Sequence, residues 1–207
     1  MNALLLIDLQ NDFCPGGSLP VTGGHDIIPA INAIQPAFKL VVATKDWHPK
    51  DHASFAVNHG KQPGEVIQLD GLDQVLWPAH CVQGSPGAEF VPGLDTKRIA
   101  KIFLKGVDQT IDSYSGFFDN GHRRATGLGE YLKDQGVNGV VVVGLATDYC
   151  VKWTALDAKN LGFETAVAVD VCRGVNLRPG DVDRALDEMR DAGVKLVQSA
   201  EVLAVKK

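Results

Sequence analysis

The sequence contains no hydrophobic run long enough to cross a membrane. Its longest apolar stretch, residues 140–146, is far shorter than the roughly 20 residues that a spanning helix needs. Another apolar stretch, residues 3–7, lies near the N-terminus, but no basic residue precedes it and Asp8 interrupts it, which is untypical of a signal peptide. We therefore expect a cytoplasmic protein that makes no membrane contact.

Basic charge and paired cysteines are also scarce. The 207 residues carry 20 Lys and Arg against 25 Asp and Glu, a net charge of −5, so the composition indicates no affinity for nucleic acid. The four cysteines are scattered without a C-x-x-C pair. In a chain without a secretion signal, such cysteines are expected to be free thiols rather than disulfides.

The chain has the length of one domain, and two kinds of segment alternate along it. Short, continuous apolar runs rich in β-branched residues predict buried strands at residues 3–7, 40–43, 99–104, 140–145, 165–169 and 194–197. Helical patterns lie at residues 26–38, 127–135, 148–160 and 182–192. This alternation predicts a single α/β domain over residues 1–207, with a parallel sheet covered by helices on both faces.

Residues 47–97 break this rhythm. They contain many Gly, Pro and His residues and few periodic signals. Loops of this length are uncommon in compact domains and are usually functional or disordered. Two of the three tryptophans, Trp47 and Trp77, lie here, which argues against disorder. We expect an ordered loop region that binds ligands.

Polar or reactive residues follow four successive predicted strands. They are Asp8, Asp46, Lys105 and Cys150, the last at the end of the segment 144–150 that opens a helix. Open α/β sheets bind ligands in the crevice at the carboxyl ends of their strands. Four such residues together therefore predict an active site at this edge.

Cys150 is the candidate nucleophile. Its place in the first turn of a helix, with Thr147 or Asp148 as the cap, exposes it to unpaired backbone N–H groups that favour the thiolate and could hold an oxyanion. The alternative is a buried structural cysteine. Asp8 could take up and return the proton while Lys105 keeps that carboxylate ionised. Taken singly, Asp8 could instead be a capping residue and Lys105 an ordinary strand-end lysine.

A second group has the composition of a metal site. Asp46 and His48 stand at i, i+2 and point the same way in an extended segment. His52 follows shortly after, and His80 lies further along the same loop region. Asp and His are ligands of zinc, iron and manganese. We expect one divalent ion, Zn, Fe or Mn.

The chain resembles the nicotinamidases and pyrazinamidases of the isochorismatase-like cysteine hydrolase superfamily. The matching segments follow in family order: IDLQNDF (7–13), TKDWHP (44–49), WPAHCV (77–82), FLKG (103–106), YSGF (114–117) and GLATDYCV (144–151). The resemblance implies a three-layer fold with a six-stranded, mostly parallel sheet. It also implies a triad of Asp8, Lys105 and Cys150, with backbone N–H groups of Ala146 and Cys150 as the oxyanion hole and a cis peptide bond just before Ala146.

The resemblance also implies the roles of the loop residues. Asp46, His48 and His80 match metal ligands, and His52 matches a position that binds metal directly in some members and indirectly in others. The aromatic residues that form the walls around the substrate ring in the family match Phe13, Trp77 and Tyr114 here.

The activity implied is hydrolysis of nicotinamide, and of pyrazinamide, to the acid and ammonia through a cysteine thioester, in NAD salvage. Beyond this substrate, the resemblance implies no partner other than further copies of the same chain. We expect a monomer or a small homo-oligomer. One alternative is a related amidase acting on ureido or carbamoyl amides, but such relatives usually lack the metal motif. Another is a non-catalytic metal- or nucleotide-binding module, which would have no need for Asp8, Lys105 and Cys150 together.

Overall fold

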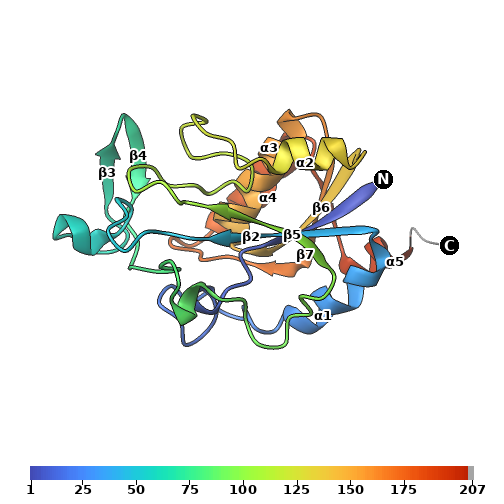
Figure 1. Cartoon of the computed structure of the whole chain (residues 1–207), viewed down its shortest axis with the longest axis horizontal. Coiled ribbons are helices and arrows are strands. Elements are labelled where there is room, and N and C mark those ends of the chain that lie inside the picture. The colour runs from blue at the N-terminus through green and yellow to red at the C-terminus, as the bar shows by residue number, and fades with distance from the viewer. Residues whose placement is uncertain (205–207) are drawn as a thin grey trace.

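The computed structural model describes residues 1–204 and contains a six-stranded parallel sheet (Figure 1). Its strands stand in the order β5-β2-β1-β6-β7-β8, and each neighbouring pair is parallel. The bounds are β1 (Asn2–Ile7), β2 (Leu40–Asp46), β5 (Ile99–Lys105), β6 (Gly139–Leu145), β7 (Glu164–Arg173) and β8 (Lys195–Val197). The six predicted strands are therefore confirmed, although β2 and β7 run further than their apolar cores.

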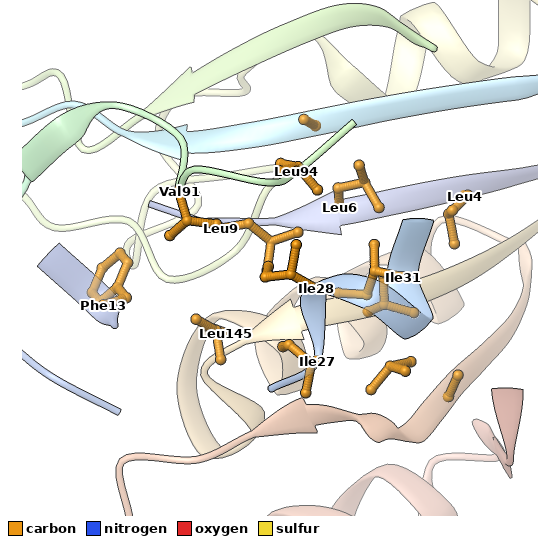
Figure 2. Packing of buried hydrophobic residues seen from close by; sticks show 14 of the residues in the cluster. Leu4, Leu6, Leu9, Phe13, Ile27, Ile28, Ile31, Val91, Leu94 and Leu145 are labelled. Atoms are coloured by element: carbon orange, nitrogen blue, oxygen red, sulfur yellow. The ribbon is translucent and has the colours of Figure 1, made fainter. Parts of the chain in front are cut away.

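Helices cover both faces of the sheet, as predicted (Figure 1). They are α1 (Ile28–Ile34), α2 (Leu128–Asp134), α3 (Lys152–Asn160), α4 (Asp181–Asp191) and α5 (Ser199–Ala204). Successive residues of β1 point to opposite faces, so Leu4 and Leu6 pack with Ile31 of α1, whereas Leu5 packs with Leu132 of α2. Figure 2 shows the first of these two clusters. The result is the expected three-layer architecture.

The predicted helix at residues 26–38 is shorter than expected. Regular α-helix ends at Ile34, and residues Gln35–Ala37 form a 3₁₀ turn. Pro36 lacks the backbone N–H that would continue the α-helical hydrogen bonds.

The loop region 47–97 contains a hairpin that the sequence analysis did not predict. Strands β3 (Val66–Leu69) and β4 (Leu72–Val75) pair antiparallel and stand apart from the main sheet (Figure 1). Asp70 and Gly71 join them with φ of 52° and 83°, the positive values that a two-residue hairpin turn of this type requires. The Asp-Gly pair between apolar residues was the signal that could have revealed it.

No helix among the described residues is long and apolar enough to span a membrane. The four cysteines are buried and free, in agreement with the expected free thiols.

Candidate active site

The strand order brings the four predicted strand-end residues together. Asp8 follows β1, Asp46 and Lys105 end β2 and β5, and Cys150 follows β6. These four strands are neighbours in the order β5-β2-β1-β6, so their ends meet at one edge. Lys105 Nζ lies 2.9 Å from Asp8 Oδ2 and 3.4 Å from Cys150 Sγ. All four side chains are buried.

Lys105 is the charged centre of the group. Its ammonium also donates to Asp46 Oδ1 and, over 2.8 Å, to the carbonyl oxygen of Ser113. Burial by itself lowers the pKa of Lys105, but the carboxylates of Asp46 and Asp8 outweigh it and raise the pKa well above its usual value. Lys105 is therefore a permanent cation between two carboxylates.

Asp8 is held by a threonine that the sequence analysis did not select. Thr44 Oγ1 donates to Asp8 Oδ1 over 2.6 Å, leaving Oδ2 beside Lys105. Burial raises the pKa of Asp8, while Lys105 and the Thr44 hydrogen bond oppose the rise. A carboxylate with a raised pKa is better suited to move protons near neutral pH than an ordinary aspartate.

Cys150 lies in a π-helical turn, Thr147–Val151, that precedes α3. The turn follows Ala146, and the Leu145–Ala146 peptide bond is cis, as the resemblance implied. The prediction of Thr147 or Asp148 as cap was wrong, because Ala146 is the cap residue and no side chain caps the turn. Asp148 instead accepts hydrogen bonds from the backbone N–H groups of residues 175 and 176, 2.9 and 2.7 Å away.

The surroundings of Cys150 also contain groups that oppose the expected thiolate. Burial raises the pKa of the Cys150 thiol well above its usual value, Lys105 opposes the rise, and the carboxylates of Asp8 and Asp46 add to it. The backbone N–H groups at the helix start and Lys105 thus favour the thiolate, whereas burial beside two anions opposes it, and Asp8 is available as an acceptor for the proton.

Asp46, His48 and His80 form a group that could hold a metal ion. His48 Nδ1 donates to the Gly106 carbonyl oxygen over 2.9 Å, and His80 Nδ1 donates to that of Pro78 over 2.8 Å. Because a carbonyl only accepts, Nδ1 carries a hydrogen in both rings, so in the neutral imidazole Nε2 has the lone pair that a metal ligand needs; the two Nε2 atoms lie 3.6 and 3.7 Å from Asp46 Oδ2. His48 Nε2 is buried and has no hydrogen-bond partner among residues 1–204. This donor set fits a divalent ion.

His52 stands behind this group, with its ring centroid 4.2 Å from that of His48. Its Nδ1 is 2.8 Å from Ser54 Oγ and its Nε2 is 3.3 Å from the carbonyl oxygen of Ile111. Both ring nitrogens thus have protein partners, which favours an indirect role. Asp112, which the sequence analysis missed, offers a carboxylate oxygen within 4.8 Å of ligand atoms of His48 and His52.

The aromatic residues selected from the sequence line one cavity together with Cys150 and two members of the metal-binding group, Asp46 and His80. Trp77 Nε1 donates to Tyr114 Oη over 3.3 Å, and the Phe13 ring lies 5.4 Å from that of His80. The cavity is lined by Phe13, Leu19, Asp46, Trp77, His80, Asp112, Tyr114, Ala146, Tyr149, Cys150 and Val175. It combines flat apolar walls, a nucleophile and a metal-binding group, which suits a small aromatic amide.

Comparison with known proteins defines the family. The Isochorismatase domain family matches residues 2–201, and the chain belongs to this family. A nicotinamidase from Escherichia coli (strain K12) is 49% identical over 203 residues, which are 96% of this chain and 95% of that protein. The solved structure of a nicotinamidase and pyrazinamidase from Acinetobacter baumanii has a TM-score of 0.95 at 48% identity and covers 97% of both chains.

Two further solved structures contain ligands. PnC1 from L. infantum, in complex with nicotinate, is 40% identical with a TM-score of 0.85, over 97% of this chain and 93% of that one. A pyrazinamidase from Pyrococcus horikoshii, in complex with zinc, is 41% identical with a TM-score of 0.78, over 95% and 98%.

Proposed function

We propose that this chain is a cytoplasmic nicotinamidase that hydrolyses nicotinamide, and also pyrazinamide, to the acid and ammonia, and so serves NAD salvage. The observation that carries the proposal is the contact between two groups. Lys105 lies against Asp8 and Cys150 and, through Asp46, against the metal-binding histidines. The nucleophile Cys150 therefore lines one aromatic cavity with Asp46 and His80, and the proton acceptor Asp8 lies behind it against Lys105.

Asp46, His48 and His80 would hold one divalent ion, with His52 behind them. The zinc complex of the related pyrazinamidase supports zinc, and iron and manganese suit the same donor set. When bound, the ion supplies a ligand position for the ring nitrogen of the substrate, which orients the amide. The walls Phe13, Trp77 and Tyr114 would hold the ring itself.

The first half of the reaction forms a thioester. Asp8 takes the proton of the Cys150 thiol while Sγ forms a bond to the carboxamide carbon. The carbonyl oxygen becomes an oxyanion, for which the backbone N–H groups of Ala146 and Cys150 are the proposed donors. Asp8 then returns the proton to the amide nitrogen as the C–N bond breaks and ammonia departs. Lys105 stabilises the carboxylate of Asp8 in its ionised form.

The second half releases the acid. Asp8 takes a proton from a water molecule whose oxygen attacks the thioester carbon. The C–S bond breaks, and Cys150 recovers a proton from Asp8. The products are nicotinate, ammonia and an unchanged enzyme.

An ammonia-release assay on nicotinamide and pyrazinamide, with metal analysis of the same sample, tests the proposal. We expect both amides to be hydrolysed by protein carrying about one divalent ion per chain. Cys150→Ala should abolish turnover and retain the metal. Ammonia release by this variant would contradict the covalent route, and release from a ureido amide instead of nicotinamide would place the chain among the other amidases.

A further inference from the structure

The β3–β4 hairpin buries one of its strand residues, and that residue is polar. Gln74 is 3% exposed, whereas the other residues of β3 and β4 are exposed or half-buried. Glutamine is mostly a surface residue, and a buried amide must be hydrogen-bonded to avoid a large desolvation cost. The partners of Gln74 therefore indicate what this hairpin, which stands outside the main sheet (Figure 1), is attached to.

Gln74 is attached to the cavity. Its Nε2 lies 3.0 Å from Asp112 Oδ2, 3.4 Å from Tyr114 Oη and 2.7 Å from the Val75 carbonyl oxygen. An amide nitrogen has two hydrogens, so these three oxygens share them. Asp112 and Tyr114 both line the cavity that contains Cys150.

Asp112 depends on this contact. It is 3% exposed, and no lysine or arginine among residues 1–204 forms an ion pair with it. Its Oδ1 accepts from the backbone N–H of Ser113 over 2.7 Å, and the Gln74 amide is the side chain that donates to Oδ2. Hydrogen bonds to a charged group are stronger than neutral ones, so loss of the amide should release this carboxylate from its place.

Tyr114 is joined to the same stretch of chain a second time. Trp77 Nε1 donates to Tyr114 Oη over 3.3 Å, and Trp77 comes two residues after the end of β4. Two donors from one short segment, Gln74 and Trp77, thus meet at one hydroxyl oxygen. The Tyr114 hydroxyl is therefore tied both to β4, through Gln74, and to the Trp77 wall.

We propose that Gln74 is a positioning residue that determines specificity. By fixing Asp112 and the separation of the Trp77 and Tyr114 walls, it restricts the cavity to flat ring amides without further ring substituents. This inference rests on the proposed function, since it takes the cavity as the site of a ring amide.

Gln74→Met keeps the length of the side chain and removes its amide. We expect KM for nicotinamide to rise about 10-fold, the effect of one hydrogen bond to a charged group, while kcat changes less than about twofold. The ratio of kcat/KM for nicotinamide to kcat/KM for 5-methylnicotinamide should fall by about 10-fold, which is within the range by which enzymes discriminate against one extra methyl group. Gln74→Glu keeps the shape but places a second carboxylate beside Asp112, and should raise KM further.

The matched control is Gln68→Met, because Gln68 is exposed on the paired strand β3 and contacts Asp73 outside the cavity. It should leave KM and selectivity unchanged. A role of Gln74 in hairpin folding alone would lower Tm and leave both unchanged, and this result in Gln74→Met would overturn the inference. If Gln74→Met does not fold, Gln74→Glu decides by the same criterion. A wild-type enzyme inactive on nicotinamide would contradict the proposed function instead.

Discussion

Two regions of the molecule build the cavity in different ways. Asp8, Lys105 and Cys150 come from the carboxyl ends of β1, β5 and β6 in one parallel sheet, and their places follow from the register of that sheet. His48 and Trp77 come from the loop region 47–97, where backbone carbonyls and side-chain hydrogen bonds hold them. The sheet carries the proposed chemistry, and the loop region carries the proposed binding.

This difference predicts how variants in the two regions should behave. Residues held by the sheet act on the reacting atoms, so changing them should lower kcat. Residues of the loop region orient metal and ring, so changing them should weaken binding and raise KM. Asp46 lies at the border of the two regions, since it ends β2 and belongs to the metal-binding group. Lys105 contacts its carboxylate, and the Gln10 amide makes two 2.8 Å hydrogen bonds to its backbone.

Among variants that keep the nucleophile, the largest effect is expected for Asp8→Asn. The amide keeps the shape of the side chain and cannot take the thiol proton, so kcat should fall by about 10²–10⁴-fold, the usual contribution of a general base. Steady-state kinetics and metal analysis check this, and metal content should stay at the wild-type level. A variant that loses affinity with kcat intact would place Asp8 with the binding region and break the comparison.

A smaller effect is expected for Gly106→Ala, where the two regions touch. A Cβ at Gly106 would lie 2.3 Å from His48 Cε1, and the residue has φ of +63°. The His48 ring should shift, and metal affinity should fall by about 10–100-fold, as for other changes around metal ligands. Calorimetric titration of metal-free protein with zinc measures this affinity.

Gly93→Ala is the control for backbone strain, since Gly93 has φ of +88° with open space around its Cβ position. It should cost stability without changing metal affinity. Equal metal affinities for the two alanine variants would contradict the proposed role of His48.

The smallest effect is a shift in pH dependence on Thr44→Val. Burial raises the pKa of Asp8, and the Thr44 hydrogen bond partly offsets this rise. A base works only when deprotonated, so kcat/KM should fall as the pH drops through the pKa of Asp8, above its usual 3.8. Removing the hydroxyl raises that pKa, and the acid limb should move to higher pH.

Thr126→Val removes a hydroxyl that donates to the Gly116 carbonyl oxygen and should leave the limb in place. If the acid limb of the kcat/KM profile moves in neither variant, or moves to lower pH in Thr44→Val, a group other than Asp8 controls the loss of activity at low pH.

The same contrast explains what could be predicted from the sequence. Continuous apolar runs identify parallel strands, and neighbouring strand ends must meet, so Asp8, Lys105 and Cys150 could be placed together. Thr44 was not selected, because its place beside Asp8 depends on the register of β1 and β2, which pair up to residues 6 and 43. The raised pKa of the Cys150 thiol could not be predicted, since it depends on the depth of burial.

The loop region was less predictable for a physical reason. Gln74 and Asp112 are 38 residues apart in the chain, and no periodic pattern fixes how a hairpin packs on a distant loop. The segments TKDWHP (44–49) and WPAHCV (77–82) identified the metal-binding residues through the chemistry of Asp and His and through the family resemblance. They did not predict how these residues are arranged in space.

Mass spectrometry of the intact protein, quenched during turnover on nicotinamide, tests whether the reaction passes through a cysteine thioester. A nicotinoyl thioester that maps to Cys150 should form in wild type and be absent from Cys150→Ala. It should accumulate far more slowly in Asp8→Asn. Turnover without any acyl group on Cys150, or with the group on another cysteine, would contradict this route.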